Sequence, residues 1–148
     1  MIFTTQGSSI PKVLITTVPF GDKNQLPIEL LENSCVEYLI NPLNKKLTED
    51  ELAKLITDFD VIIAGTEPIT EKVMDRASNL KLISRVGIGL DSVDLYAARK
   101  RGILVSYTPD APAKAVSDLT IGLMLNLLRK TYLSNSRMHQ GEWERFFG

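Results

Sequence analysis

The stretch Leu80–Ser106, LKLISRVGIGLDSVDLYAARKRGILVS, decides the fold class. It begins and ends with short runs rich in Leu, Ile and Val, at Leu80–Arg85 and Ile103–Ser106, which are typical of buried strands. Between them lie a Gly-rich turn and a helical pattern that stops at Gly102. A strand, a crossover helix and a second strand predict a parallel βαβ unit.

The same alternation extends toward the N-terminus. Three more short apolar runs predict strands, at Lys12–Val18, Cys35–Ile40 and Asp60–Ala64. Helical patterns separate the strands, with starts expected at Gln25, at Thr48, at Thr70, and at Asp91 or Ser92. Thr48 and Glu51 have the spacing of a capping box. The pattern predicts an α/β fold, a doubly wound parallel sheet of five strands covered on both faces.

After Ser106 the character of the sequence changes. The segment YTPDAPAKA holds two prolines and reads as a linker. A long helix is expected over 114–132, with apolar residues on nearly every face, which predicts packing partners on more than one side. We therefore expect one domain over residues 1–106, then a linker, long helix and tail over 107–148.

Composition excludes several classes of function. Lys and Arg total 17 against 18 for Asp and Glu, a net charge of −1, so no nucleic-acid partner is expected. The single cysteine, Cys35, cannot form an internal disulfide, no apolar run has the length of a membrane span, and the N-terminal residues do not resemble a signal peptide. These features predict a cytoplasmic protein without a membrane partner. With His139 as the one histidine, no metal site is expected.

The turn Gly87–Ser92, GIGLDS, admits three interpretations. A dinucleotide site is disfavoured because Ser92 replaces the third glycine and Asp91 brings negative charge toward the phosphates. The glycines can simply form a tight turn before a helix. Alternatively, their backbone N–H groups can bind a small carboxylate at the carboxyl ends of the strands. Residue chemistry alone leaves the last two open.

The run from Ser84 to Arg129 resembles the D-isomer-specific 2-hydroxyacid dehydrogenases, especially the phosphoglycerate dehydrogenase branch, in its R-x-G-x-G-x-D and G-I-x-V motifs and in the T-P that follows. GTEPIT at 65–70 and G-x-W-x-R at 141–145 match as well. The resemblance implies a flavodoxin-like substrate-binding domain and the helix that links it to an NAD-binding domain. It places the catalytic residues beyond Gly148, so this chain alone is expected to be inactive.

The resemblance also implies roles for individual residues. Ile88 and Gly89 match the loop whose N–H groups hold the substrate carboxylate, and Gly87 shapes that loop. Thr66 and Glu67 follow the third strand, where they could touch the distal part of the substrate. Val116 matches a position near the nicotinamide, although plain helix packing explains it too. No catalytic or metal-binding residue carries over, and NAD is the cofactor expected for a whole enzyme.

Several expectations accompany these roles. Glu67 could equally be a solvated or capping carboxylate, and Arg85 a solvated or ion-paired side chain rather than one that steers carboxylates. His139 is expected at a surface or helix end. No arginine lies between Ala64 and Pro68, where phosphoglycerate-specific relatives often carry one, which argues against a phosphorylated substrate.

Two interpretations of the whole protein remain open, an enzyme domain and a binding module. The ligand is expected to be a small 2-hydroxy or 2-oxo acid, and the helix over 114–132 and the aromatic tail (Trp143, Phe146 and Phe147) predict a homodimer. The competing interpretation is a stand-alone carboxylate-binding or regulatory module with a flavodoxin-like fold.

Overall fold

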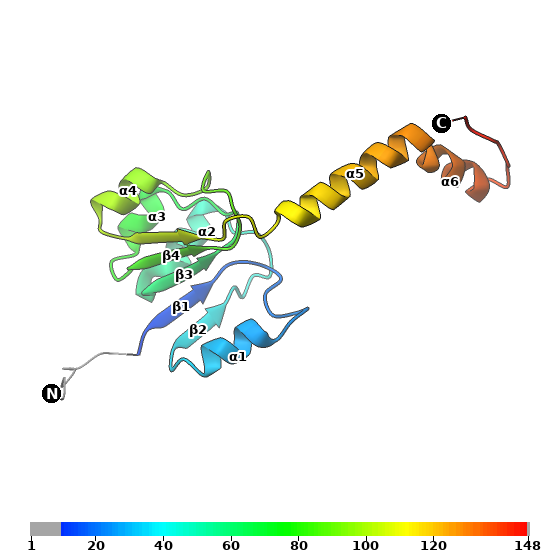
Figure 1. Ribbon diagram of the computed structural model, residues 1–148. Helices are drawn as coiled ribbons and strands as arrows, with labels where there is room; N and C mark the ends of the chain where they lie inside the picture. Colours follow the sequence, from blue (N-terminus) through cyan, green and yellow to red (C-terminus); the bar gives the residue numbers. More distant parts are fainter. Residues whose placement is uncertain (1–9, 148) are drawn as a thin grey trace. The chain divides into compact units, whose positions relative to one another are not determined.

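The computed structural model describes residues 10–147 (Figure 1). The first nine residues, on which part of the signal-peptide argument rests, lie outside this range. The chain divides into two compact units that part between Pro109 and Asp110.

A parallel five-stranded sheet forms the centre of the first unit, with the strand order β2-β1-β3-β4-β5. The strands are β1 (Lys12–Ile15), β2 (Glu37–Ile40), β3 (Val61–Ala64), β4 (Leu82–Arg85) and β5 (Leu104–Tyr107). All five predicted strands are confirmed, although β1 ends three residues before Val18. The register aligns Ala64 with Arg85 and Arg85 with Tyr107, so the loops after β3, β4 and β5 begin at the same edge of the sheet.

Helices connect the strands as the sequence predicts. They are α1 (Leu26–Glu32), α2 (Glu49–Leu55) with the short 3-10 helix η1 (Ile56–Asp58), α3 (Glu71–Arg76) and α4 (Leu95–Lys100). Helices α2, α3 and α4 lie side by side and bury a core with the sheet. Its fully buried members include Leu14, Leu52, Ile62, Ile69, Val73 and Ile83. This is the flavodoxin-like α/β fold that was expected.

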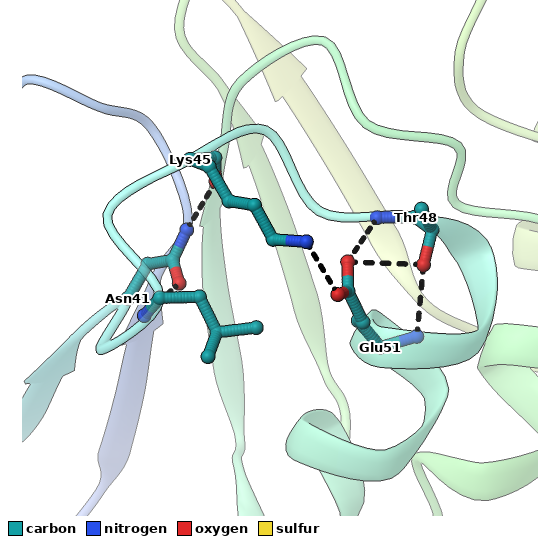
Figure 2. A network of polar contacts seen from close by, with 5 residues as sticks. Asn41, Lys45, Thr48 and Glu51 are labelled. Carbon is teal, nitrogen blue, oxygen red and sulfur yellow. Dashed lines mark hydrogen bonds and ion pairs between the residues drawn. The ribbon is translucent and has the colours of Figure 1, made fainter.

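The predicted capping box at the start of α2 is confirmed (Figure 2). The Glu51 backbone N–H donates to Thr48 Oγ1 at 3.3 Å, and the Thr48 N–H donates to Glu51 Oε2 at 2.9 Å. The Lys45 amine donates to the other carboxylate oxygen, Glu51 Oε1, at 2.6 Å. Hydrogen bonds from Lys45 and from Thr48 lower the pKa of the Glu51 carboxyl to about 2.

The predicted cap of α4 is wrong. The N-cap is Asp94, whose side chain accepts the Ala97 N–H at 2.9 Å, and neither Asp91 nor Ser92 caps the helix. The turn runs longer because Ile69 pairs with this segment: its N–H donates to the Ser92 carbonyl at 2.7 Å. This bridge ties the loop after β3 to the loop after β4.

The second unit holds two helices, α5 (Ala113–Arg129) and α6 (Thr131–His139). The expected single helix over 114–132 is therefore wrong at its C-terminal end. Lys130 adopts a left-handed conformation with φ of 53°, which ends α5 and begins α6. The observed linker is shorter than the expected segment YTPDAPAKA, because Tyr107 belongs to β5 and α5 begins at Ala113. Among the helices of the described residues, none is both long and apolar enough to traverse a lipid bilayer.

Candidate functional site

Loops from four strands meet at the carboxyl edge of the sheet. Thr16 follows β1, Glu67 follows β3, Gly87 follows β4 and Thr108 follows β5. In open parallel sheets this edge is where ligands bind. The five predicted substrate-binding residues (Thr66, Glu67, Gly87, Ile88 and Gly89) all lie in two of these loops.

Gly87 gives the loop after β4 its shape. Its φ is +132°, and a Cβ at this position would lie 2.9 Å from Arg85 Nη1, so a side chain meets both a conformational and a steric obstacle. The Gly87 N–H donates to Thr108 Oγ1 at 2.7 Å, and the Thr108 N–H donates to the Gly87 carbonyl at 3.1 Å. Thr108, which follows β5, thus fixes the position of Gly87, and the Gly87 N–H is not free to bind a ligand.

The backbone N–H groups that follow Gly87 in the turn are available. Those of Ile88 and Gly89 have no hydrogen-bond partner among residues 10–147, and neither do those of Leu90, Asp91 and Ser92. Two adjacent free donors suit one small anion. A Cβ on Gly89 would lie 3.2 Å from Asp91 Oδ2, so a carboxylate lies beside the second donor. The Gly87 N–H is engaged by Thr108, so the first glycine of the turn has no N–H to offer to a phosphate group.

The buried Glu67 side chain links the loops after β1 and β3 by hydrogen bonds. Its side chain is 2% exposed, and its Oε1 accepts the Thr16 hydroxyl and, at 2.9 Å, the Gly65 N–H. It is therefore neither a solvated carboxylate nor a helix cap; the N-cap of α3 is Thr70. Thr66, its neighbour, is exposed.

A hollow of about 230 Å³ lies between the loops after β1, β3 and β4. Its lining combines polar, charged and small residues, namely Thr16, Thr17, Val18, Lys46, Gly65, Thr66, Glu67, Arg85 and Val86. Arg85 is 9% exposed, and its Nη1 donates to the Val86 carbonyl. Its Nε is buried without a hydrogen-bond partner, and no ion pair to Arg85 occurs within residues 10–147. The expectation of a solvated or ion-paired Arg85 is therefore wrong.

Three residues of this edge were not predicted from the sequence, namely Thr16, Lys46 and Thr108. Thr16 and Thr108 lie one residue beyond a strand end and Lys46 lies six residues beyond one, and only the strand order brings them to the loops of Glu67 and Gly87. A search of the residues that follow each predicted strand would have found Thr108 but not Thr16, which lies inside the predicted strand Lys12–Val18.

The remaining residues with predicted roles, which are Val116, His139 and the aromatic tail, lie in the second unit. Val116 is on α5 with its side chain 58% exposed. His139 is the last residue of α6 and is exposed, as expected for a helix end. Trp143 and Phe147 are exposed, and Phe146 is half-buried. Within the described range, no group of three or more His, Cys, Asp and Glu side chains could hold a metal ion.

Comparison with known proteins identifies the family of the chain. Residues 13–143 match the family described as D-isomer specific 2-hydroxyacid dehydrogenase, catalytic domain. The chain belongs to this family. The resemblance inferred from the motifs is thereby confirmed.

Proteins with several different names are similar to this chain in sequence. The D-3-phosphoglycerate dehydrogenase of Methanocaldococcus jannaschii is 41% identical over 101 residues, which cover 67% of this chain and 19% of that protein. The hydroxypyruvate reductase of Thermotoga maritima is 37% identical, over 78% of this chain and 40% of that protein. The chain therefore spans between a fifth and two fifths of these relatives.

Solved structures agree with the fold. The TT0316 protein of Thermus thermophilus aligns with a TM-score of 0.79 and 32% identity, over 92% of this chain and 42% of that one. The NAD+-bound 3-phosphoglycerate dehydrogenase of Entamoeba histolytica aligns with a TM-score of 0.74 and 28% identity, over 84% of this chain and 41% of that one. The family is thus an oxidoreductase family of small hydroxy and oxo acids.

Proposed function

We propose that this chain is the substrate-binding portion of an NAD-dependent D-2-hydroxyacid dehydrogenase, which interconverts a 2-hydroxy acid and a 2-oxo acid by hydride transfer. The observation that carries the proposal is the pair of free N–H groups at Ile88 and Gly89, in a loop held by Thr108 at the carboxyl edge of the sheet. Backbone donors in such a loop hold a carboxylate without a charged side chain.

Each residue has a distinct task in this proposal. The N–H groups of Ile88 and Gly89 bind the substrate carboxylate, and Gly87 sets their direction. Thr66 and Glu67 lie where the distal part of the substrate would extend. Val116 is assigned a place near the nicotinamide on family resemblance alone. The acid-base group that hydride transfer requires is not assigned to this chain.

The proposal predicts binding without turnover. The 148-residue chain with NADH and a panel of 2-oxo acids should show no NADH oxidation above background, because no dinucleotide site or acid-base group is assigned to it. In a ¹⁵N-labelled sample, the same acids should shift the amide resonances of Ile88 and Gly89. Turnover above background would contradict the first expectation, and unshifted loop amides the second.

We also propose a cofactor, an oligomeric state and a cellular location for the whole protein. NAD as the cofactor is supported by the NAD+-bound relative of known structure. A homodimer through 114–132 is supported by the exposed apolar residues of α5. A cytoplasmic location rests on composition. We also propose that residues 1–106 form the substrate-binding domain, followed by the linker and helix.

A stand-alone carboxylate-binding module uses the same loop. It is favoured by one observation: the first unit has its own core and carries the free N–H groups of Ile88 and Gly89 within itself. The reading frame beyond Gly148 distinguishes the two functions, because a dinucleotide fingerprint within about twenty residues would identify a dehydrogenase.

A further inference from the structure

The Thr108 hydroxyl lies beside the carboxylate loop and has a proton that no residue accepts. Thr108 Oγ1 accepts the Gly87 N–H at 2.7 Å, and this is its one hydrogen bond within residues 10–147. A threonine hydroxyl can accept and also donate one hydrogen bond. Its acceptor side is therefore used and its donor side is not. Because Thr108 is exposed, a ligand can reach this unused donor.

The position of this hydroxyl is fixed by several independent restraints. The Thr108 N–H donates to the Gly87 carbonyl at 3.1 Å, which holds the backbone, and the Gly87 N–H holds the side-chain oxygen. Threonine is β-branched, and Pro109 follows it, so both its side-chain and its backbone rotations are restricted. The oxygen faces the Gly87 N–H with a lone pair, so the hydroxyl proton points elsewhere.

The hydroxyl is close enough to the free N–H groups to share a ligand with them. Because consecutive backbone nitrogens lie at most about 3.6 Å apart, Thr108 Oγ1 is within about 6.3 Å of the Ile88 nitrogen. A carboxylate has two oxygens and about four acceptor sites, more than two N–H groups can fill. Hydrogen bonds to an ionised acceptor are also stronger than neutral ones, and the N–H bond that the hydroxyl already accepts polarises it as a donor.

Asp91 favours the end of the turn at which Thr108 lies. Free N–H groups continue from Ile88 to Ser92, so the donors alone do not place an anion. A Cβ on Gly89 would lie 3.2 Å from Asp91 Oδ2, which puts a negative charge beside the later donors. Since like charges repel, a bound carboxylate is expected nearer to Ile88 and Thr108 than to Ser92.

Other threonine hydroxyls at this edge of the sheet do not offer the same donor. Thr16 Oγ1 already donates to the Glu67 carboxylate and lies 3.2 Å from the Ile63 carbonyl oxygen. Thr66 is exposed, but no hydrogen bond joins it to the carboxylate loop in the part of the chain that the structure describes. Thr108 is thus the threonine that combines a free proton with a fixed place against this loop.

We propose that Thr108 is a substrate-binding residue, whose hydroxyl is a third donor to the carboxylate beside the N–H groups of Ile88 and Gly89. The inference rests on the proposed function, since it takes the acid to be bound at those two N–H groups. The contact is with the carboxylate, which all 2-oxo and 2-hydroxy acids share. Thr108 therefore strengthens the binding of each acid by a similar factor and does not select among them.

The test is a titration of the ¹⁵N-labelled 148-residue chain and its variants with pyruvate, glyoxylate and D-lactate at constant ionic strength. Thr108→Val keeps the β-branched shape without the hydroxyl, and should weaken the binding of all three acids by about tenfold or more. Thr108→Ser keeps the hydroxyl and should bind them nearly as tightly as the wild-type chain. The matched control is Thr57→Val, which removes an exposed hydroxyl that lies 3.4 Å from the Lys54 carbonyl oxygen, and it should bind as the wild type does.

A second measurement separates a lost donor from a displaced loop, because Thr108→Val also removes the acceptor of the Gly87 N–H. Residual dipolar couplings report the orientation of the Ile88 and Gly89 N–H bonds in the ligand-free chain. We expect them to be unchanged in Thr108→Val, since the backbone bond from residue 108 to the Gly87 carbonyl remains. Reoriented N–H bonds together with weaker binding would assign the effect to loop geometry and overturn the third donor.

The remaining outcomes distinguish this inference from the proposed function. If no acid shifts the amides of Ile88 and Gly89 in the wild-type chain, the proposed function fails. If the acids shift them and Thr108→Val binds as tightly as the wild type, only the role of Thr108 is overturned. Equal weakening in Thr108→Val and Thr108→Ser would also overturn it, because serine retains the hydroxyl. Weakening of one acid alone would contradict a contact with the shared carboxylate.

Discussion

At the scale of single residues, Gly87 is a position where a side chain would be strained. Its positive φ and the closeness of Arg85 Nη1 act together. We predict that Gly87→Ala lowers the free energy of unfolding by about 1 to 3 kcal/mol and abolishes the acid-induced shifts at Ile88 and Gly89. Urea denaturation and amide titration measure the two effects.

Gly102→Ala is the matched control for Gly87→Ala. Gly102 has a φ of +70°, but a Cβ there would meet no atom within 4 Å. This variant has a smaller conformational cost, because +70° lies near the left-handed helical region, and it has no contact with Arg85 and lies outside the loop. It should be destabilised less and keep the acid-induced shifts. Equal loss of binding in both variants would contradict the assignment of Gly87 to the carboxylate loop.

At the scale of elements, the start of α2 makes stability depend on pH. Glu51 has a folded pKa of about 2 against an ordinary value of 4.5, because Lys45 and Thr48 donate hydrogen bonds to its carboxylate. A folded pKa below the unfolded one adds stability that is present above pH 4.5 and is lost as pH falls toward 2. We predict that the wild-type chain loses more stability over this window than Glu51→Gln does.

Thermal denaturation at a series of pH values measures this difference between the two chains. Asp60 also has a lowered pKa, caused first by the Lys12 N–H and then by Lys81, and it contributes equally to both chains. Subtracting the two curves therefore isolates Glu51. Parallel curves through the whole window would show that the capping box does not couple to pH.

Local elements could be predicted from the sequence, and long-range contacts could not. The capping box needs residues only three apart, so Thr48 and Glu51 reveal it. The bond from Gly87 to Thr108 joins residues 21 apart, and the bond from Thr16 to Glu67 joins residues 51 apart. Those pairs require the strand order, which apolar runs do not specify.

The misplaced cap of α4 has the same cause. Asp91 and Ser92 are good capping residues by type, but Ile69 on another loop binds the Ser92 backbone and delays the helix to Asp94. Likewise, no residue type in the apolar run of α5 predicts the left-handed conformation of Lys130. Tertiary pairing and single backbone angles thus override local preference at the ends of elements.

At the scale of the whole molecule, the two units differ in how well they cover their apolar residues. The first unit has a buried core, whereas α5 and α6 contain no buried residue. Several large apolar side chains of α5 are more than half exposed, among them Leu119, Leu123, Leu127 and Leu128. An apolar surface of this kind on a helix commonly marks a protein–protein interface.

We predict that the chain self-associates through α5. Leu119, Leu123 and Leu127 lie four residues apart and therefore on one face of the helix. Light scattering at concentrations on the order of tens of micromolar should give the mass of a dimer or a larger assembly, because burying this face removes apolar surface from water.

Leu123→Glu should return a monomer with an unchanged first unit, since a carboxylate at a buried interface is costly. Ser117→Glu, an exposed polar position of the same helix, should keep the assembly. A wild-type monomer at these concentrations would contradict the homodimer, and loss of association in both variants would assign the effect to added charge rather than to the apolar face.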